Sequence, residues 1–219
     1  RDVLGSRGLG DVYKRQPSLY EVSYKEDGTI ASFEPTVEGV PRTILKQIQM
    51  DLTETYYPRK PLVPFIKITQ DRVTLEIQRG CIRGCRFCQA GQLYRPVRER
   101  DVDMLKQCAV DMLDSTGQEE ISLSSLSSSD YSKLEELVTF LMETGRERMV
   151  NISLPSLRID AFSLDIMSKV QDVKKSSLTF APEAGSQRLR DVINKGLTEE
   201  VILTVSYTHL RAHETLRHL

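Results

Sequence analysis

The stretch VTLEIQRGCIRGCRFCQAG, residues 73–91, joins a short β-prone run to a loop that contains three of the chain's four cysteines. The run covers residues 73–78, and its composition is typical of a strand. Cys81, Cys85 and Cys88 follow at once, in the spacing CxxxCxxC. A strand that leads directly into closely spaced thiols predicts a chemical site at the end of that strand.

Further β-prone runs follow, and each is succeeded by a helical pattern. The four runs are VTLEIQ (73–78), EEISLSS (119–125), MVNISLP (149–155) and SSLTFAP (176–182). The later ones recur about every 30 residues, which is the length of a βα unit. This periodicity predicts an α/β fold with a parallel sheet and helices outside it. In such folds the ends of the strands carry the site.

Apolar residues at three-and-four spacing predict a helix after each run. The first is expected over about 102–113, the second over 131–145 with its end at a glycine, and the third over 163–170. The fourth is expected to begin at Ser186 as its N-cap and to end at Gly196.

Residues 17–72 are expected to form a linker, and residues 73–204 the α/β core. In LYEVSYKEDGTIASF (19–33), two alternating runs surround Asp-Gly, a dipeptide that favours a hairpin turn. Pro41 is expected to open a helix that ends before Pro58. The proline-rich stretch YYPRKPLVPF (56–65) then predicts an extended connector.

The two ends of the chain read differently from the rest. RDVLGSRGLGDVYKRQ (1–16) and VSYTHLRAHETLRHL (205–219) look like translated sequencing-adapter sequence, and all three histidines lie in the second stretch. We expect both ends to be artefacts and the body between them to be a clipped fragment. The alternative is a flexible tail at each end.

Composition excludes several function classes. The two ends hold six of the 30 basic and three of the 31 acidic residues, so the body keeps 24 basic and 28 acidic residues. This balance excludes general nucleic-acid binding. No apolar run approaches the roughly 18 residues of a membrane span, so no membrane association is expected. Four cysteines without an extracellular cue indicate reduced thiols and a cytoplasmic location.

The thiol loop allows two kinds of metal site. Gly80 and Gly84 permit the tight backbone angles that fold the sulfurs towards one point. A structural zinc site needs four ligands, and with no histidine in the body the fourth would be Cys108 or a carboxylate. Cys108 lies beside the apolar stripe of the first helix, where an idle thiol is expected. A four-iron cluster on three cysteines instead leaves one iron with open coordination positions.

The segment CIRGCRFC (81–88) fits CxxxCxΦC and resembles the signature of the radical SAM superfamily, with Phe87 as the aromatic. Together with the later blocks ISLSSLSSSDY, SLPSLRID and FAPEAGSQRLRDVINKG, it resembles the bacterial radical SAM proteins that carry an N-terminal cobalamin-binding domain. The likeness covers about residues 18–204. It implies a partial (β/α) barrel of which about four βα units are present.

The resemblance also implies the chemistry. Cys81, Cys85 and Cys88 would ligate a [4Fe-4S] cluster whose fourth iron binds S-adenosylmethionine. Reductive cleavage of that ligand would give a 5′-deoxyadenosyl radical, with electrons supplied by a donor such as flavodoxin or ferredoxin. Cobalamin would bind through a domain outside this sequence. The substrate is unknown, and the fragment alone is expected to be inactive.

Other site residues follow from the same likeness. Phe87 would pack near the adenine or the cluster, or would fill the barrel mouth. Ser124 and Ser125 stand where related proteins have a glycine-glycine-glutamate segment that contacts the amino group of S-adenosylmethionine. Six arginines lie within residues 79–100; they would favour an anionic, reduced cluster. For Arg95, Arg98 and Arg100 a solvated surface patch is the alternative.

Two later segments complete the expected site. Ser153, Ser156 and Arg158 would reach the ribose or carboxylate of S-adenosylmethionine, or would cap the third strand. Glu183 would bond to ribose or substrate, or would support the N-terminus of the helix that begins at Ser186.

Two classes of function remain open. The first is radical chemistry, in which a cobalamin-assisted methylation or rearrangement competes with a methylthiotransferase-like modification of RNA or protein. The second is a zinc-binding interaction module.

Overall fold

The computed structural model describes residues 17–155, 157–159 and 180–214. The chain divides into two compact units, residues 1–48 and 49–219. Each unit is built around its own sheet, and we describe them separately.

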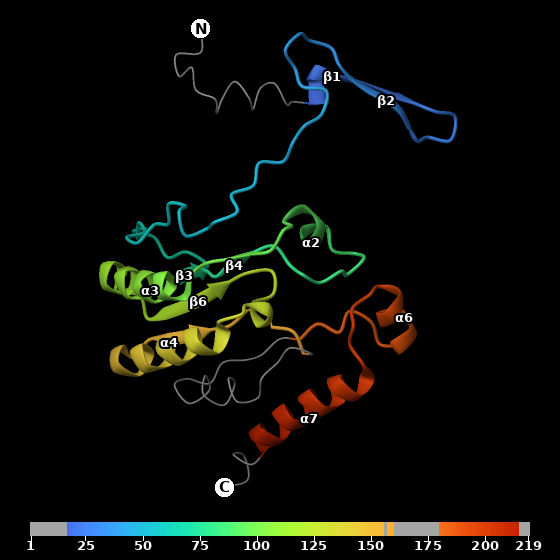
Figure 1. Cartoon of the computed structure of the whole chain (residues 1–219). Helices are drawn as coiled ribbons and strands as arrows, with labels where there is room; N and C mark the ends of the chain where they lie inside the picture. Colours follow the sequence, from blue (N-terminus) through green and yellow to red (C-terminus); the bar gives the residue numbers. More distant parts are fainter. Residues whose placement is uncertain (1–16, 156, 160–179, 215–219) are drawn as a thin grey trace. The chain divides into compact units, whose positions relative to one another are not determined.

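The first unit contains the predicted hairpin. After the short 3-10 helix η1 (Pro17–Leu19), strands β1 (Tyr20–Tyr24) and β2 (Ile30–Pro35) pair antiparallel (Figure 1). Between them, Asp27 accepts a hydrogen bond of 2.9 Å from the backbone N–H of Thr29. The expectation drawn from the Asp-Gly dipeptide is therefore confirmed.

The helix expected to begin at Pro41 is not formed, and that prediction is wrong. Residues 41–57 contain bends, turns and irregular backbone. Ile44 and Leu45, two residues of the expected apolar face, are 43% and 70% exposed. An isolated amphipathic helix gains most of its stability from burying one face. Leu52, from the same expected face, is fully buried, so these apolar residues do not share one buried face and the pattern alone does not produce a helix.

The second unit contains a three-stranded parallel sheet in the order β3-β6-β7. Its strands are β3 (Val73–Glu76), β6 (Glu120–Ser124) and β7 (Asn151–Ser153). The first three predicted strands are therefore confirmed, and with them the mixed α/β class. Of the fourth run, residues 176–179 lie outside the described residues, and 180–182 are not in a strand. The expected third helix, 163–170, also lies outside the described part of the chain.

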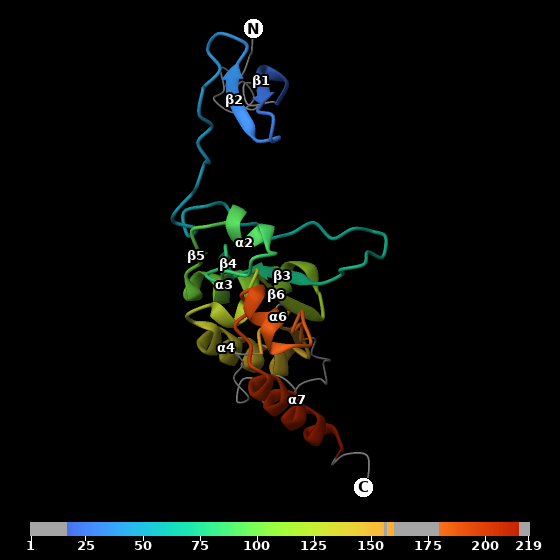
Figure 2. The ribbon, with the colours of Figure 1, turned by 90° about the vertical axis from the view of Figure 1, so that its right-hand side faces the viewer.

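Helices α3 (Val102–Thr116) and α4 (Leu134–Arg148) connect these strands. The two helices pack against each other, and also against β3 and β7 respectively (Figures 1 and 2). Asp101 caps α3 by accepting a 2.9 Å bond from the N–H of Met104. Gly117 ends α3 in the left-handed conformation that glycine adopts without strain.

Helix α4 does not stop at Gly145 as predicted but continues to Arg148. A Cβ atom at residue 145 would lie 2.8 Å from the carbonyl oxygen of Val150. The glycine is there because the chain leaving the helix returns across it, and the N–H of Val150 bonds to the Gly145 carbonyl at 2.9 Å. Close packing rather than helix termination explains this glycine.

The two faces of the parallel sheet differ in chemistry. Val73, Ile121 and Ile152 are in register across the three strands and belong to one buried cluster with α3 and α4. The next residues along the strands, Thr74, Ser122 and Ser153, form a polar row in the same register. Because side chains alternate along a strand, this row lies on the face away from the helices.

Among its described residues, the second unit has three more α-helices. They are α2 (Gln89–Leu93), α6 (Gln187–Val192) and α7 (Glu199–Glu214). Ser186 caps α6 as predicted, by accepting a bond from the N–H of Leu189. The helix ends before Gly196, because Asn194 already adopts a positive φ of 55°.

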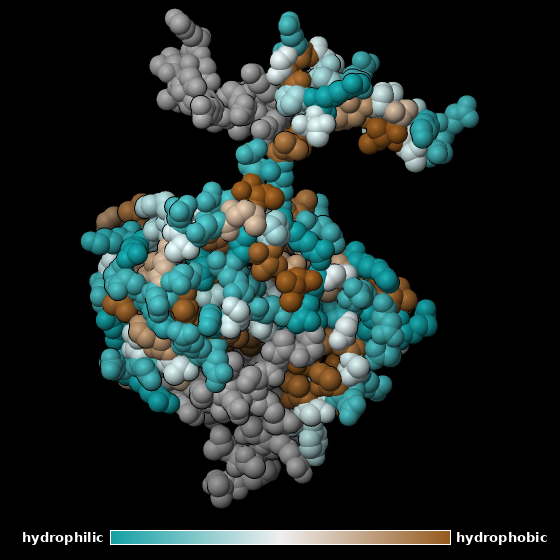
Figure 3. Space-filling model, in the orientation of Figure 1, coloured by the Kyte–Doolittle hydropathy of each residue, from teal (hydrophilic) through white to brown (hydrophobic). Residues whose placement is uncertain are grey.

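Helix α7 crosses residue 205, so no break in secondary structure marks the expected start of the adapter-like tail. Among the described residues, no helix combines the length and the hydropathy that a membrane span requires. On the face shown in Figure 3, hydrophobic residues form separate groups among hydrophilic ones.

Candidate functional site

The cysteine loop, residues 80–97, follows β3 (Val73–Glu76) and lies between two short strands. A two-stranded ribbon of β4 (Gln78–Arg79) and β5 (Arg98–Glu99) closes its base. Between that base and the first thiol, Gly80 has a φ of +88°, and a Cβ there would lie 2.5 Å from the Tyr94 carbonyl oxygen. Only glycine fits, so the start of the loop at Gly80 packs closely against residues 94–97, which lead into β5.

The three thiols differ in burial and in their backbone contacts. Cys85 is buried, whereas Cys81 and Cys88 are half-buried. The N–H of Arg83 lies 3.4 Å from the Cys81 sulfur, and the N–H of Gly91 lies 3.3 Å from the Cys88 sulfur. Backbone donors to sulfur are among the contacts that tune iron–sulfur clusters.

Within the described residues, no three histidine, cysteine or acidic side chains lie close enough together to hold a metal ion. The donor set itself suits a soft metal, because three thiols lie within eight residues and two of them accept backbone hydrogen bonds. A fourth thiol does not join them. Cys108 is fully buried in the apolar cluster under the sheet, and burial raises the pKa of its thiol, as expected for an idle cysteine.

The serine-rich loop runs from Ser124, the last residue of β6, to Asp130, and its residues bond to one another. Ser125 and Ser128 are joined through their hydroxyls at 3.1 Å, and Ser125 also accepts the N–H of Ser127. The carbonyl of Ser124 accepts the N–H of Ile77 at 3.0 Å. This last bond ties the loop directly to the strand that leads to the cysteines.

An ion pair joins the cysteine loop to the serine-rich loop. The guanidinium of Arg83 donates two hydrogen bonds to the carboxylate of Asp130, whose side chain is only 7% exposed. Burial acts to raise the pKa of Asp130, but the bonds from Arg83 and Ser127 outweigh it and lower that pKa below its usual range. Asp130 is therefore held as a carboxylate.

The end of α6 contacts the cysteine loop from another side. The Asn194 amide donates to the Gly84 carbonyl at 2.8 Å, and the N–H of Arg86 donates to the Ile193 carbonyl at 2.9 Å. The Arg86 guanidinium also bonds to the Val192 carbonyl. Phe87 is 54% exposed. The three bonds are made by groups between the cysteines, so the end of α6 holds the loop between its thiols.

The other predicted residues are partly brought together. The N–H of Arg158 donates to the Ser129 hydroxyl at 2.9 Å, and its guanidinium donates to the Lys195 carbonyl at 2.9 Å. The Lys195 ammonium in turn bonds to the Glu183 carboxylate at 3.1 Å and lies 5.8 Å from the ring centre of Phe87. Arg158, Glu183 and Phe87 thus meet around Lys195.

Ser153 stands apart from this group. Ser153 lies on β7 beside Ser122, and Ser156 lies outside the described residues.

Of the three arginines for which a surface patch was the alternative, Arg95 is exposed but Arg98 and Arg100 are buried. Arg98 and Arg100 are 9% and 2% exposed, and they bond to the carbonyls of Gln49 and Leu52. For these two residues that alternative is wrong, because they anchor the chain before β3. Arg95 donates to the Cys81 and Arg83 carbonyls and therefore belongs to the cysteine loop.

Sequence reasoning missed Asp130, Asn194 and Lys195. Asp130 and Asn194 bond to the cysteine loop across 47 and 110 positions of sequence. No local spacing signals such contacts. The one available signal was the position of Asp130, six residues after the end of a strand in a parallel sheet.

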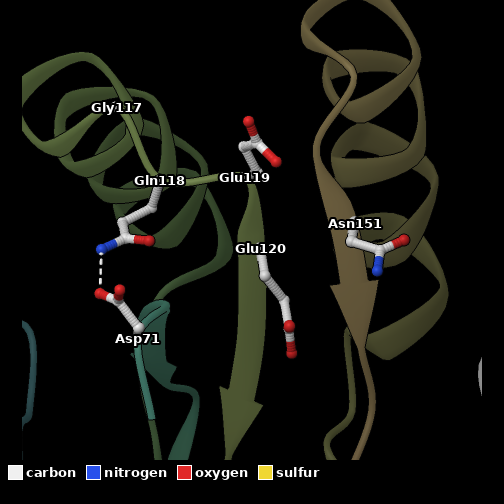
Figure 4. Close-up of a pocket in the computed structure, with 6 residues that line it drawn as sticks. All are labelled: Asp71, Gly117, Gln118, Glu119, Glu120 and Asn151. Atoms are coloured by element: carbon white, nitrogen blue, oxygen red, sulfur yellow. Dashed lines mark hydrogen bonds between the residues drawn. The ribbon is translucent and has the colours of Figure 1, made fainter. Parts of the chain in front are cut away.

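The opposite edge of the sheet has a pocket of a different kind. Its volume is about 430 Å³, and it lies where β6 and β7 begin (Figure 4). Its lining residues are Asp71, Gly117, Gln118, Glu119, Glu120 and Asn151. Gln118 donates to Asp71 at 2.6 Å across one side of the pocket. The lining carries no thiol, and none of the predicted site residues contributes to it.

Similarity to known proteins points to the same chemistry as the three cysteines. The family model described as the Radical SAM superfamily matches residues 75–209, which is more than half of the chain. The chain belongs to the radical SAM superfamily. As a member it is expected to bind a [4Fe-4S] cluster and S-adenosylmethionine, and membership indicates an enzyme.

Two curated relatives come from the archaeon Methanocaldococcus jannaschii. An uncharacterized protein is 37% identical over 175 residues, which is 76% of this chain and 37% of the relative. A protein provisionally named as a methylthiotransferase is 26% identical over 137 residues, or 58% of this chain and 30% of the relative. The chain thus spans little more than a third of the length of the first. The expected bacterial, cobalamin-binding group stays a prediction.

Proposed function

We propose that this chain is part of a radical SAM enzyme in which Cys81, Cys85 and Cys88 hold a [4Fe-4S] cluster at the carboxyl edge of the parallel sheet. When bound, that cluster supplies an electron that cleaves S-adenosylmethionine to methionine and a 5′-deoxyadenosyl radical. The observation that carries the proposal is the cysteine loop itself. It follows β3 and the short strand β4 and has backbone donors at two of its three sulfurs.

The chain's own residues contribute position and charge. Arg95 places a cationic group beside the loop and binds its carbonyls, whereas the charge of Arg83 is balanced by Asp130. A cationic group there favours a more anionic cluster. Lys195 gathers Arg158, Glu183 and Phe87 on one side of the loop. We assign these four residues to the S-adenosylmethionine side of the site, because they are polar or aromatic groups that converge beside the thiols.

Ser124 and Ser125 have a more limited role in this proposal. The carbonyl of Ser124 and the hydroxyl of Ser125 already make hydrogen bonds within the protein. Contact with the ligand's amino group is therefore assigned to the second acceptor positions of these oxygens. Ser153 is assigned to the polar row of the sheet, together with Thr74 and Ser122.

This polar row supports the finer proposal of a partial barrel. Parallel sheets usually carry apolar side chains on both faces, because helices cover both. Here one face is apolar and packs against α3 and α4, while the other carries Thr74, Ser122 and Ser153. A sheet that curves around a polar ligand would need such an inner face.

The partner in electron transfer would be a flavodoxin or ferredoxin, in the cytoplasm.

A second candidate within the same class is methylthiotransferase-like modification of RNA or protein. The relative provisionally named as a methylthiotransferase favours it, at 26% identity over part of the chain. A cobalamin-dependent reaction is supported by the sequence resemblance alone.

The test is anaerobic reconstitution of the full-length protein. We expect about four irons and four labile sulfides per chain and, after addition of S-adenosylmethionine and reductant, release of 5′-deoxyadenosine. A sample that holds tetrahedral zinc without labile sulfide would instead support the zinc-binding interaction module and would refute the proposal.

A further inference from the structure

Four residues close a ring of hydrogen bonds at the base of the cysteine loop, which we call the inter-loop ring. Gln78 donates from its amide to the Ser127 carbonyl at 2.7 Å, and the Ser127 hydroxyl donates to Asp130 at 2.7 Å. Asp130 then accepts from Arg83, with Nε at 2.9 Å. The chain from Gln78 to Arg83 closes the ring, and Cys81 lies within that segment.

The inter-loop ring is largely shielded from water. Gln78 and Ser127 are 2% and 1% exposed, and the side chains of Asp130 and Arg83 are 7% and 30% exposed. A bidentate pair between arginine and a carboxylate is directional, and removing one partner leaves a buried charge uncompensated. The ring therefore fixes the separation of the two loops more strictly than an exposed ion pair would.

Arg83 carries this constraint to the sulfur. Its guanidinium is fixed by Asp130, its carbonyl accepts Arg95 at 2.8 Å, and its own N–H points to the Cys81 sulfur at 3.4 Å. Three groups of one residue are thus held by three different parts of the site. If the guanidinium is released, nothing in the inter-loop ring keeps the Arg83 N–H directed at Cys81.

We infer that Arg83 and Asp130 are positioning residues that fix the orientation of Cys81 within the cysteine loop. Only the binding of a metal group by that thiol rests on the proposed function. The orientation of Cys81 is a property of the polypeptide and is measurable before any metal is bound.

The first experiment measures the alkylation rate of each thiol in the reduced, metal-free, full-length protein by peptide mass spectrometry. Arg83→Gln and Asp130→Asn are each expected to raise the rate at Cys81 about tenfold, and the double variant is expected to add little, because both substitutions break one interaction. Cys108 reports global unfolding, since it is fully buried in the core.

A matched control is the ion pair of Arg72 with Glu120, which joins the chain before β3 to β6 at the other edge of the same sheet. Arg72→Gln is expected to leave the Cys81 rate within about twofold of wild type. An unchanged Cys81 rate in both Arg83→Gln and Asp130→Asn would overturn the inference. So would a rise that Cys108 matches, because that result reports unfolding alone.

The second experiment uses the reconstituted protein and its reduction potential. Arg83→Gln removes a positive charge beside the cluster and is expected to lower the potential, whereas Asp130→Asn removes a negative charge and is expected to raise it. Potential shifts of the same sign would contradict the assigned positions. If wild type binds no iron, the proposed function fails, while the alkylation result still decides whether these residues position Cys81.

Discussion

The two edges of the parallel sheet use the same three strands but treat polar groups differently. At the carboxyl edge, Gln78 and Arg100 are almost fully buried and bond to carbonyls of other segments. At the amino edge, acidic and amide side chains line an open pocket (Figure 4). Burying polar groups is costly unless their bonds are satisfied. At the carboxyl edge, buried polar side chains thus hold loops in place through their hydrogen bonds.

At each edge an ion pair joins the chain flanking β3 to a residue in β6 or in the loop after it. The carboxylate of Asp130, at the cysteine edge, is 7% exposed, whereas that of Glu120, at the pocket edge, is 34% exposed. Exposed pairs contribute little to stability, and buried ones mainly enforce geometry. The buried carboxylate of Asp130 is therefore suited to positioning, whereas Glu120 belongs to the surface of the pocket edge.

The largest expected effect concerns the thiols themselves. Cys85→Ala should abolish the iron and labile sulfide of the reconstituted protein, because a three-cysteine cluster cannot spare a ligand. Cys108→Ala, in the core, should cost about 1–2 kcal/mol of unfolding free energy but retain the iron. Iron and sulfide assays with urea unfolding compare the two. Equal iron loss in both variants would contradict the assignment of the site.

The next effect compares a glycine from each edge. Gly80→Ala should lower the free energy of unfolding by about 3 kcal/mol or more, because its Cβ would meet two carbonyl oxygens in addition to the strain of a positive φ. Gly117 also has a positive φ, but nothing lies within 4 Å of its Cβ position. Gly117→Ala should therefore cost only about 1 kcal/mol. Urea unfolding of both variants measures the difference, and equal losses would show that steric contact is unimportant at Gly80.

A third effect concerns the buried arginine that anchors the chain before β3. Arg100 bonds to Leu52, Thr55 and Glu76 and stacks 4.4 Å above the Tyr57 ring. Arg100→Met should cost about 3 kcal/mol and should expose residues 49–57 to proteolysis. As control, Arg148→Gln breaks an exposed pair with Asp114 and should cost under about 1 kcal/mol. Similar proteolysis of both variants would contradict the anchoring role.

The smallest effect is the pH dependence of Asp130. Because its pKa in the folded protein lies below that of the unfolded chain, its contribution to stability is complete above about pH 4 and is lost as the pH falls further. Asp130→Asn should therefore flatten the acid side of the stability curve. Urea midpoints between pH 3 and pH 7 would measure this, and parallel curves for wild type and variant would refute it.

Local chemistry allowed much of the fold to be predicted. Ser186 as an N-cap, the Asp-Gly turn and the three strand runs depend on neighbouring residues, and each is found as expected. The helix expected from Pro41 failed because periodicity does not reveal whether a face finds a partner. The prediction that the second helix ends at Gly145 failed for a similar reason. This glycine is explained by its close contact with the carbonyl of Val150, which the local sequence does not reveal.

The site was predictable in its metal ligands but not in its supports. The spacing of the three cysteines was enough to predict them as metal ligands. Asp130, Asn194 and Lys195 are ordinary polar residues whose importance arises from contacts across long stretches of chain. The burial of Arg98 and Arg100 was equally hidden, because an arginine in sequence gives no indication of which carbonyls it will meet.

The bond from Asn194 to the Gly84 carbonyl has a consequence for biosynthesis. The two residues are 110 positions apart. At the roughly 5–20 residues per second of translation, the thiols leave the ribosome several seconds before the segment that braces them exists. During that interval the nascent loop lacks one of its supports. Metal delivery by cellular assembly factors would therefore act on its final shape only after α6 has been made.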